Sequence, residues 1–216
     1  MNSTKDNWSI LALVRHGESE WNAKGLWTGW TDIGLSEKGR LEARKAAFLL
    51  KGINFDIAIS SNLKRAIQTM EIILADLNQS NIPVYKSEEF NERNYGDFTA
   101  KNKWQMKKLL GEEEFLRVRR GWDIPIPNGE TLKDVYMRVI KGYDKLIKPA
   151  IAKRKKILLS AHGNSLRALV KYIENIPDEM ISQVEIATGE SLVYYFNKEG
   201  KVIDKKTLST KNVVLK

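Results

Sequence analysis

The chain contains only two histidines, and both stand in the same local pattern. His16 follows the apolar segment 9–14, and His162 follows the apolar segment 156–160. Each histidine is followed directly by a glycine, which lets the backbone turn sharply and lets a ligand approach closely. A lone histidine is more often structural than catalytic, but two histidines in equivalent positions favour one shared reaction site.

Two imidazoles in one site can divide a reaction between them. One can act as a nucleophile that forms a covalent intermediate, and the other can donate hydrogen bonds to the charge that develops during transfer. Arg15 stands beside His16, and a guanidinium binds phosphate through two parallel hydrogen bonds. Asn164 and Ser165 are expected to cap a helix after His162, and the N–H groups at such a helix start form an anion site. The pattern favours a phosphate-bearing substrate.

A metal site fits this sequence poorly. A zinc site needs at least three protein ligands at a usable spacing, and the chain offers two histidines and no cysteine. No His-Glu-x-x-His segment occurs, so carboxylates would have to complete the site. We therefore predict that no metal is bound. The absence of cysteine also excludes a disulfide framework.

Apolar segments with strand character alternate with amphipathic segments along the chain. Strands are predicted over 9–14, 55–60 and 156–160, with a short extended piece over 83–85 and a final pair over 191–196 and 201–207. Helices are predicted over 36–51, 62–77, 101–120, 131–152 and 164–174, with Ser36 as an N-cap and a break at Gly111.

This alternation predicts an α/β fold with three layers, in which a mostly parallel central sheet carries helices on both faces. No internal repeat, low-complexity stretch or long linker divides the chain, so we expect a single domain over residues 1–216. In such folds, ligands bind beyond the carboxyl ends of the strands, where the loops converge. Both histidines stand at such strand ends, which places the expected reaction site there.

The composition is that of a globular protein, with 216 residues of which 42% are hydrophobic and 29% are charged. No run of about 18 apolar residues is present, so we expect no membrane association. Residues 1–8 are polar and lack the apolar core of a secretory signal, so we expect a cytoplasmic protein.

The net charge is +9, which would suit a nucleic-acid partner, a solvated surface or a small anionic substrate. Acidic residues stand near many of the lysines, as in 101–114, and no basic and aromatic recognition motif accompanies them. We therefore expect no nucleic-acid partner. The excess charge is explained by a solvated surface, or by arginines that hold an anionic substrate while surface lysines raise its local concentration.

The segment 13–29, LVRHGESEWNAKGLWTG, resembles the phosphohistidine signature of the histidine phosphatase superfamily. Four further blocks narrow the resemblance to the 2,3-bisphosphoglycerate-dependent phosphoglycerate mutases. These blocks cover 28–30, 63–66, 91–96 and 161–172, and they follow the family order across nearly the whole chain. Many members have a long insertion before the helix expected at 131–152, and the direct bridge 122–130 resembles the shorter bacterial form. The resemblance implies a phosphoglycerate mutase-like fold.

The resemblance also implies a role for each matching residue. His16 would be the phosphorylated nucleophile, and Glu92 would be the general acid and base for the substrate hydroxyl. Arg15, Arg65 and His162 would surround the transferring phosphoryl group. The remaining expected contacts are to anionic groups: Asn22, Gly163 and Asn164 for the phosphoryl group, Thr28 and Gly29 near the substrate carboxylate, and Tyr95, Lys103, Arg119 and Arg120 for the other anionic groups.

The implied reaction is the interconversion of 3-phosphoglycerate and 2-phosphoglycerate in glycolysis and gluconeogenesis. Phosphorylated His16 would pass its phosphoryl group to the substrate and form 2,3-bisphosphoglycerate, which also serves as the primer. Arginines would neutralise the charge, so no metal is expected. The partners would be small phosphoglycerates, and family members suggest a homodimer or a homotetramer, although the sequence identifies no interface.

Some segments depart from the family pattern. The stretch 100–103 reads Ala-Lys-Asn-Lys where Gly-Leu-Asn-Lys is usual, and the chain stops at Lys216 soon after its last expected strand. A shorter tail would let water reach the phosphohistidine, which supports an alternative function as a phosphatase for small phosphate esters. A silent binding module is a third hypothesis, against which the complete set of histidines, arginines and Glu92 argues.

Overall fold

The computed structural model describes residues 8–215 and shows a six-stranded sheet with the order β3-β2-β4-β1-β5-β6. Strands β1 to β4 are parallel to their neighbours in this group, β5 is antiparallel to β1, and β6 is antiparallel to β5. The strands are β1 (Ser9–Arg15), β2 (Ile57–Ser60), β3 (Val84–Lys86), β4 (Lys156–Ala161), β5 (Ser191–Phe196) and β6 (Val202–Leu208). The predicted strands and the mostly parallel sheet are confirmed.

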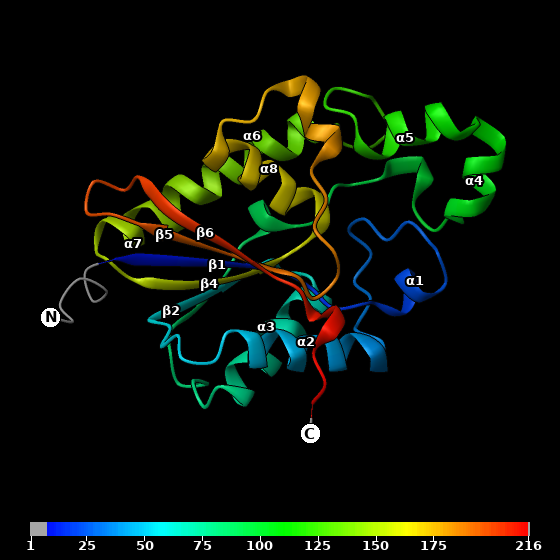
Figure 1. Cartoon of the computed structure of the whole chain (residues 1–216). Helices are drawn as coiled ribbons and strands as arrows, with labels where there is room; N and C mark the ends of the chain where they lie inside the picture. The colour runs from blue at the N-terminus through cyan, green and yellow to red at the C-terminus, as the bar shows by residue number, and fades with distance from the viewer. Residues whose placement is uncertain (1–7, 216) are drawn as a thin grey trace, which may run out of the picture.

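Helices cover both faces of the sheet, which confirms the three layers (Figure 1). One face carries α6 (Leu132–Gly142), α7 (Lys148–Ala152) and α8 (Gly163–Glu174), and the other carries α2 (Glu37–Leu49) and α3 (Lys64–Asp76). Alternate residues of β1 serve the two faces, because successive side chains of a strand point in opposite directions. Leu11 and Leu13 lie in the core under α6 and α8, and Ala12 and Val14 lie in the core over α2 and α3.

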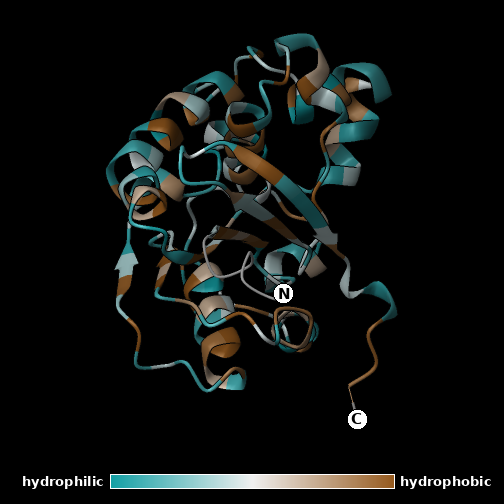
Figure 2. Cartoon of the chain, turned by 60° about the vertical axis from the view of Figure 1, so that its left-hand side comes forward, coloured by the Kyte–Doolittle hydropathy of each residue, from teal (hydrophilic) through white to brown (hydrophobic). Residues whose placement is uncertain are grey.

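Hydropathy follows these layers, as Figure 2 shows, with apolar residues on the strands and on the helix faces that meet them. Local signals fix where the helices begin. The hydroxyl of Ser36 accepts a hydrogen bond from the N–H of Gly39 at 3.1 Å, so the predicted N-cap of α2 is confirmed. The hydroxyl of Thr131 caps α6 in the same way, through the N–H of Asp134 at 3.1 Å.

The single helix predicted over 131–152 is interrupted. A π-helical turn, η3 (Tyr143–Ile147), separates α6 from α7. Pro149 follows this turn, and a proline has no N–H to donate to the carbonyl four residues earlier and clashes with it. The wider π turn accommodates the chain ahead of the proline.

The segment 101–120 forms two helices, α4 (Lys103–Leu110) and α5 (Glu112–Arg120), beyond the carboxyl ends of the parallel strands (Figure 1). Gly111 separates them with a φ of 77°, so the predicted break is confirmed. We call residues 103–120 the cap. It rests on a third, smaller hydrophobic core made by Trp27, Tyr95, Met106, Phe115, Val118 and Ile126.

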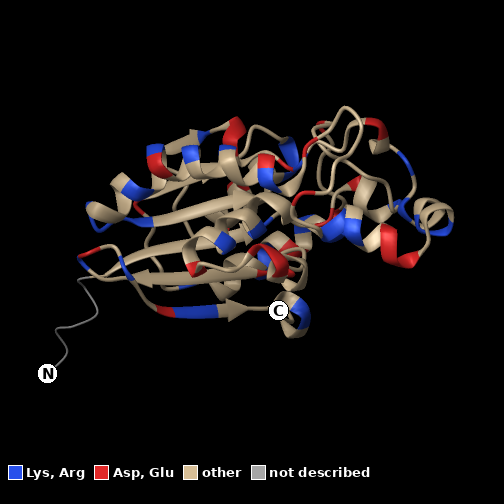
Figure 3. Ribbon diagram, turned by 90° about the horizontal axis from the view of Figure 1, so that it is seen from above, with Lys and Arg blue, Asp and Glu red and all other residues tan. Residues whose placement is uncertain are grey.

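Shorter elements complete the chain. The helix α1 (Glu20–Ala23) follows β1, and short turns of 3-10 helix are η1 (Glu88–Phe90), η2 (Gly96–Phe98), η4 (Asp178–Gln183) and η5 (Thr210–Asn212). Lysines and arginines are interspersed with acidic residues along the outer helices (Figure 3). No helix between residues 8 and 215 combines the length and the apolar character needed to cross a bilayer. The expected cytoplasmic location rests on the polar segment 1–8, and residues 1–7 of that segment lie outside the described residues.

Candidate active site

A pocket opens at the carboxyl ends of β1, β2 and β4, where the two histidine segments meet. The structure brings all the predicted site residues together there, and all of them line the pocket except His162. The lining residues from the prediction are Arg15, His16, Asn22, Thr28, Gly29, Arg65, Glu92, Tyr95, Lys103, Arg119, Arg120, Gly163 and Asn164.

His16 follows β1 directly and is buried, with 3% of its surface exposed. Its Nδ1 lies 2.6 Å from the carbonyl oxygen of Gly17, which can only accept a hydrogen bond. The proton therefore belongs on Nδ1, and Nε2 keeps its lone pair. Burial, together with Arg65 and Arg15, lowers the pKa of His16 well below its ordinary value of 6.5. A neutral imidazole of this tautomer can act as a nucleophile.

His162 follows β4 and is fully buried against the first histidine, with the ring centroids 4.9 Å apart. Its Nε2 lies 2.7 Å from the hydroxyl of Ser61, which also accepts a hydrogen bond from the N–H of Leu63. The hydroxyl proton can therefore go to Nε2, which leaves Nδ1 protonated. This Nδ1 is buried without a partner among the described residues, so it is a donor that the protein itself does not use.

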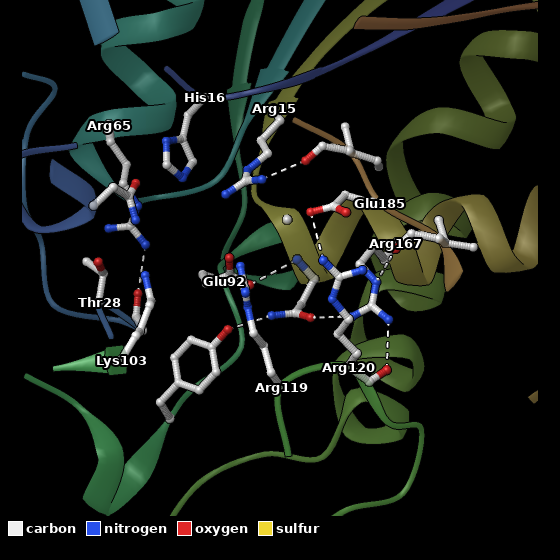
Figure 4. A pocket seen from close by; sticks show the side chains of 17 residues that line it. Arg15, His16, Thr28, Arg65, Glu92, Lys103, Arg119, Arg120, Arg167 and Glu185 are labelled. Atoms are coloured by element: carbon white, nitrogen blue, oxygen red, sulfur yellow. Dashed lines mark hydrogen bonds and ion pairs between the residues drawn. The ribbon is translucent and has the colours of Figure 1, made fainter. Parts of the chain in front are cut away.

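Two arginines flank His16, of which Arg65 is buried and Arg15 is partly buried (Figure 4). Arg15 ends β1, and its Nη1 donates to the carbonyl oxygen of Ile186 at 2.6 Å, whereas its Nε has no partner within residues 8–215. Arg65 lies in the first turn of α3 and donates to two carbonyl oxygens of the loop 29–31, at 2.7 and 3.0 Å. Burial lowers the pKa of Arg65 to about 10, so its guanidinium stays charged at neutral pH. The pair can bind a phosphoryl group beside Nε2 of His16.

Glu92 lies within electrostatic reach of both arginines, and its charge partly offsets the lowering of their pKa that burial causes. Its Oε1 accepts hydrogen bonds from the N–H of Arg93 at 2.8 Å and from that of Asn164 at 3.2 Å. Its backbone carbonyl accepts from Nε1 of Trp30 at 2.6 Å and from Nη2 of Arg138 at 2.9 Å. Both its backbone and its carboxylate are thus held, as a proton-transfer group requires.

A chain of hydrogen bonds closes another side of the pocket. The hydroxyl oxygen of Tyr95 accepts from Nδ2 of Asn164 at 2.8 Å, and Oδ1 of Asn164 accepts from Nη1 of Arg167 at 2.9 Å. Arg167 also donates to the carbonyl oxygens of Arg120 at 2.8 Å and of Val184 at 2.9 Å. Burial raises the pKa of Tyr95 to about 12, so its phenol is neutral.

The cap brings three more cations to the pocket. Lys103 begins α4, and Arg119 and Arg120 end α5. Burial, followed by repulsion from Arg119 and Arg15, lowers the pKa of Lys103 to about 8. The altered stretch 100–103 therefore still delivers its lysine to the site. Ala100 adopts a φ of 66° there, a left-handed conformation that glycine adopts more easily.

The loop after β1 supplies the remaining predicted residues. Asn22 forms a capping box with Ser19 at the start of α1. The N–H of Asn22 donates to the hydroxyl of Ser19 at 3.1 Å, and the N–H of Ser19 donates to Oδ1 of Asn22 at 3.2 Å. The hydroxyl of Thr28 is buried without a partner among the residues described here. Gly29 has a φ of 53°, and this backbone conformation favours glycine.

Two local expectations are corrected. Gly17 is required by packing rather than by ligand approach, because a Cβ there would lie 2.1 Å from the carbonyl oxygen of Gly39. The expected cap at Asn164 is wrong: α8 begins at Gly163, and the N–H of His162 donates to the hydroxyl of Ser165 at 3.1 Å. Asn164 instead lies in the first turn of the helix, where its side chain bonds to Tyr95.

Four lining residues were not predicted. Arg167 stands inside the block 161–172, so its place in that block was a usable signal. Val184, Glu185 and Ile186 come from a segment without regular structure, and nothing in the sequence pattern marks them. Among residues 8–215, no group of three or more histidine, cysteine, aspartate or glutamate side chains is placed to hold a metal ion. The metal-free site stays a prediction.

Comparison with known proteins identifies related chains. Residues 11–208 match the family model of the histidine phosphatase superfamily, branch 1. The chain is 44% identical over 202 residues to a 2,3-bisphosphoglycerate-dependent phosphoglycerate mutase of Parvibaculum lavamentivorans, covering 93% of this chain and 96% of the relative. It is 46% identical over 202 residues to a phosphoglycerate mutase of Schizosaccharomyces pombe, with the same coverage of both chains.

A solved structure with a similar fold is the α-ribazole phosphatase from Shigella flexneri. Its TM-score is 0.78 and its identity is 25%, over 96% of this chain and 100% of that chain. The similarity in sequence is therefore markedly higher to the two mutases than to this phosphatase.

Proposed function

The chain belongs to the histidine phosphatase superfamily and, within it, to the 2,3-bisphosphoglycerate-dependent phosphoglycerate mutases, and on this basis we propose that it interconverts 3-phosphoglycerate and 2-phosphoglycerate through phosphorylated His16. The two mutases that it resembles are 44% and 46% identical over 93% of the chain, which favours this activity over hydrolysis. The reaction belongs to glycolysis and gluconeogenesis.

The proposed transfer begins on phosphorylated His16. The free hydroxyl oxygen of a monophosphoglycerate attacks the phosphorus, the bond from Nε2 to phosphorus breaks, and the Glu92 carboxylate takes the hydroxyl proton. The product is 2,3-bisphosphoglycerate, which reorients in the pocket. Nε2 then attacks the other phosphoryl group, the phosphorus–oxygen bond breaks, and Glu92 returns the proton to the leaving oxygen.

Positive charge around the transferring group supports this sequence of steps. Phosphoryl transfer depends mainly on positioning and on the neutralisation of charge at the phosphoryl oxygens. Arg65 supplies a buried guanidinium beside His16 and Arg15 a partly buried one, and Nδ1 of His162 is a further donor without a partner among residues 8–215. Further contacts to the phosphoryl group are proposed for Asn22, Gly163 and Asn164, and contacts near the substrate carboxylate for Thr28 and Gly29. The other anionic groups of the substrate are proposed to be held by Tyr95, Lys103, Arg119 and Arg120.

One observation carries the proposal: the hydrogen bond from Nδ1 of His16 to the carbonyl oxygen of Gly17 at 2.6 Å. It orients the ring and leaves Nε2 without a proton, and burial together with the neighbouring arginines keeps the ring neutral. A histidine with a structural role would need neither this tautomer nor two arginines beside it.

The test is a paired assay of the wild-type and His16→Ala proteins, with EDTA present. Each receives 3-phosphoglycerate and a trace of 2,3-bisphosphoglycerate, and both 2-phosphoglycerate and free phosphate are recorded. We expect 2-phosphoglycerate to form only when the bisphosphate is supplied, and a loss of at least about 1,000-fold in His16→Ala, since the covalent route disappears.

The other outcomes of this assay identify the rival functions. Free phosphate without 2-phosphoglycerate would establish a phosphatase, the activity named for the Shigella flexneri structure. Incubation with the bisphosphate that never yields phosphohistidine on the wild-type protein would establish a silent binding module.

We further propose that the enzyme uses 2,3-bisphosphoglycerate as its primer, needs no metal and works in the cytoplasm. The name of the Parvibaculum relative supports the primer, and the number of cations in the pocket supports charge neutralisation by the protein itself. A homodimer or a homotetramer is the proposed assembly, and size-exclusion chromatography with light scattering measures it.

A further inference from the structure

A second carboxylate, in addition to that of Glu92, lies in the pocket among several cationic side chains. Glu185 is one of the lining residues, and its Oε1 lies 2.8 Å from Nη2 of Arg120 (Figure 4). Arg119 and Arg15 are also close enough to act on its charge. Arg120 is one of the groups proposed to hold an anionic group of the substrate, so an internal anion already occupies it.

The site's own arginines fix the position of this carboxylate. Nη1 of Arg15 donates to the carbonyl oxygen of Ile186 at 2.6 Å, and Nε of Arg167 donates to the carbonyl oxygen of Val184 at 2.9 Å. The backbone on both sides of Glu185 is thus held against the pocket. These two hydrogen bonds, and not the chance position of a free loop, hold Glu185 at the lining of the pocket.

The two partners differ in their freedom to move. The side chain of Glu185 is 61% exposed, whereas that of Arg120 is 25% exposed. The less exposed Arg120 side chain is the more restricted of the two, whereas the Glu185 side chain can rotate into solvent. The hydrogen bond from Arg120 lowers the pKa of Glu185, so the carboxylate is ionised throughout the neutral range.

We propose that Glu185 is an internal competitor for the substrate, which pairs with Arg120 until an anionic group of a phosphoglycerate displaces it. This inference rests on the proposed function. Each binding event exchanges one ion pair for another, so the enzyme binds its substrate less tightly than Arg120 alone would allow. The exchange also selects ligands: a phosphate ester without a second anionic group cannot replace the carboxylate and gains nothing from Arg120.

The test is a double-mutant cycle with the wild-type, Glu185→Gln, Arg120→Gln and doubly substituted proteins. Calorimetry measures the Kd for 3-phosphoglycerate without primer, and for glycerol 3-phosphate as a ligand that lacks the carboxylate. We expect Glu185→Gln to tighten 3-phosphoglycerate binding by about two- to fivefold, the range for a partly exposed ion pair. KM should fall with Kd, and glycerol 3-phosphate binding should not change.

The cycle separates pairing from net charge. In the Arg120→Gln background, the second substitution is expected to have a clearly smaller effect, because the competitor has lost its hydrogen-bonded partner and keeps only the more distant Arg119 and Arg15. Glu179→Gln serves as the control: it removes the same charge from an exposed residue of η4 that does not line the pocket. It should leave Kd unchanged.

Two results would overturn the inference: weaker or unchanged binding in Glu185→Gln, or the same gain in Glu179→Gln. Weaker binding would mean that Glu185 orients Arg120 for the substrate. Failure of the proposed function has a separate signature, which is the absence of 2-phosphoglycerate from the wild-type assay. Because calorimetry needs no turnover, the cycle still decides the role of Glu185 in that case.

Discussion

At the scale of single residues, the site depends on two imidazoles that remain neutral beside fixed positive charge. Burial, Arg65 and Arg15 lower the pKa of His16, and burial, Arg65 and the first histidine lower that of His162, in each case well below 6.5. Such a site keeps its nucleophile unprotonated in mildly acidic solution, where an exposed histidine would already be charged.

We expect neither imidazole to titrate near pH 6.5, and NMR can test this directly because the chain has only these two histidines. The ring nitrogens of His16 should show a protonated Nδ1 and an unprotonated Nε2. A ring that becomes charged between pH 7 and pH 6 would contradict the assignment. Both histidines titrating together would point to an open site.

The same depressed pKa values predict how stability changes with pH. The unfolded chain binds a proton on each histidine as the pH falls below about 6.5, and the native protein does not. The free energy of unfolding should therefore fall with decreasing pH in that window, by up to about 1.4 kcal/mol per pH unit for each histidine. In His162→Gln the slope below pH 6.5 should be smaller. An unchanged slope would contradict the prediction.

Lys103 gives a second pH dependence, on the alkaline side. Its pKa is lowered to about 8, so it is cationic below that pH and loses its charge above it. We expect kcat/KM to fall as the pH rises through about 8, because this parameter reports groups of the free enzyme. In Lys103→Arg the alkaline limb should move beyond the measurable range, since guanidinium stays protonated. A limb that stays at pH 8 in this variant would assign it to another group.

Among single residues, those marked by their type and by their place at the end of a strand were predicted to lie in the site, and the structure places them there. His16, His162 and Arg15 are of this kind. Glu185 is not, because a glutamate in an irregular segment has no pattern that points into a pocket. Its position depends on hydrogen bonds from Arg15 and Arg167 to backbone carbonyls, and such contacts between distant segments leave no local signal.

At the scale of elements, α6 controls where Glu92 stands. Arg138 projects from this helix, and its Nη1 donates to the carbonyl oxygens of Glu89 and Asn91, both at 2.8 Å. Its Nη2 donates to the carbonyl oxygen of Glu92, and its Nε pairs with Glu130 at 2.7 Å. One side chain therefore fixes most of the loop that carries the acid and base group.

We expect Arg138→Ala to lower kcat by about 10- to 100-fold, with a smaller effect on KM, because a displaced Glu92 no longer meets the hydroxyl proton. Steady-state kinetics and the pH profile of kcat measure this. Lys133→Ala removes an exposed cation from the same helix, one that pairs with Asp123 at 3.1 Å, and should change neither parameter. If Lys133→Ala loses as much kcat and kcat/KM as Arg138→Ala does, the losses would indicate general destabilisation.

Element boundaries were predictable where a cap or a glycine marks them, as at Ser36 and Gly111. The interruption of the 131–152 helix was not, because the amphipathic pattern continues through the π turn. Pro149 was the available signal of an interruption. Because it stands near the end of the segment, the sequence pattern still favoured one uninterrupted helix. The consequence is a local change of twist between α6 and α7, away from Arg138.

At the scale of the whole molecule, the pocket forms between two separately built parts. The sheet and its helices carry His16, Arg15 and Arg65 on large hydrophobic cores. The cap carries Lys103, Arg119 and Arg120 on its own small core. The sequence predicted the first part well, because strands and helices alternate clearly. It did not predict that the cap rests on a core of its own, because that core joins apolar residues from five separate loops and helices.

A cap with its own small core should loosen independently of the sheet. Phe115 is 3% exposed in this core, and its removal is expected to cost about 3–5 kcal/mol, mostly as local opening of residues 103–120. Phe115→Ala should therefore raise KM strongly and speed hydrogen exchange in the cap, while exchange in β1 and β4 stays slow. Leu116→Ala, next in sequence but 42% exposed, should leave both unchanged. If exchange rises equally in the cap and in the sheet, the two parts unfold as one unit, and the prediction is wrong.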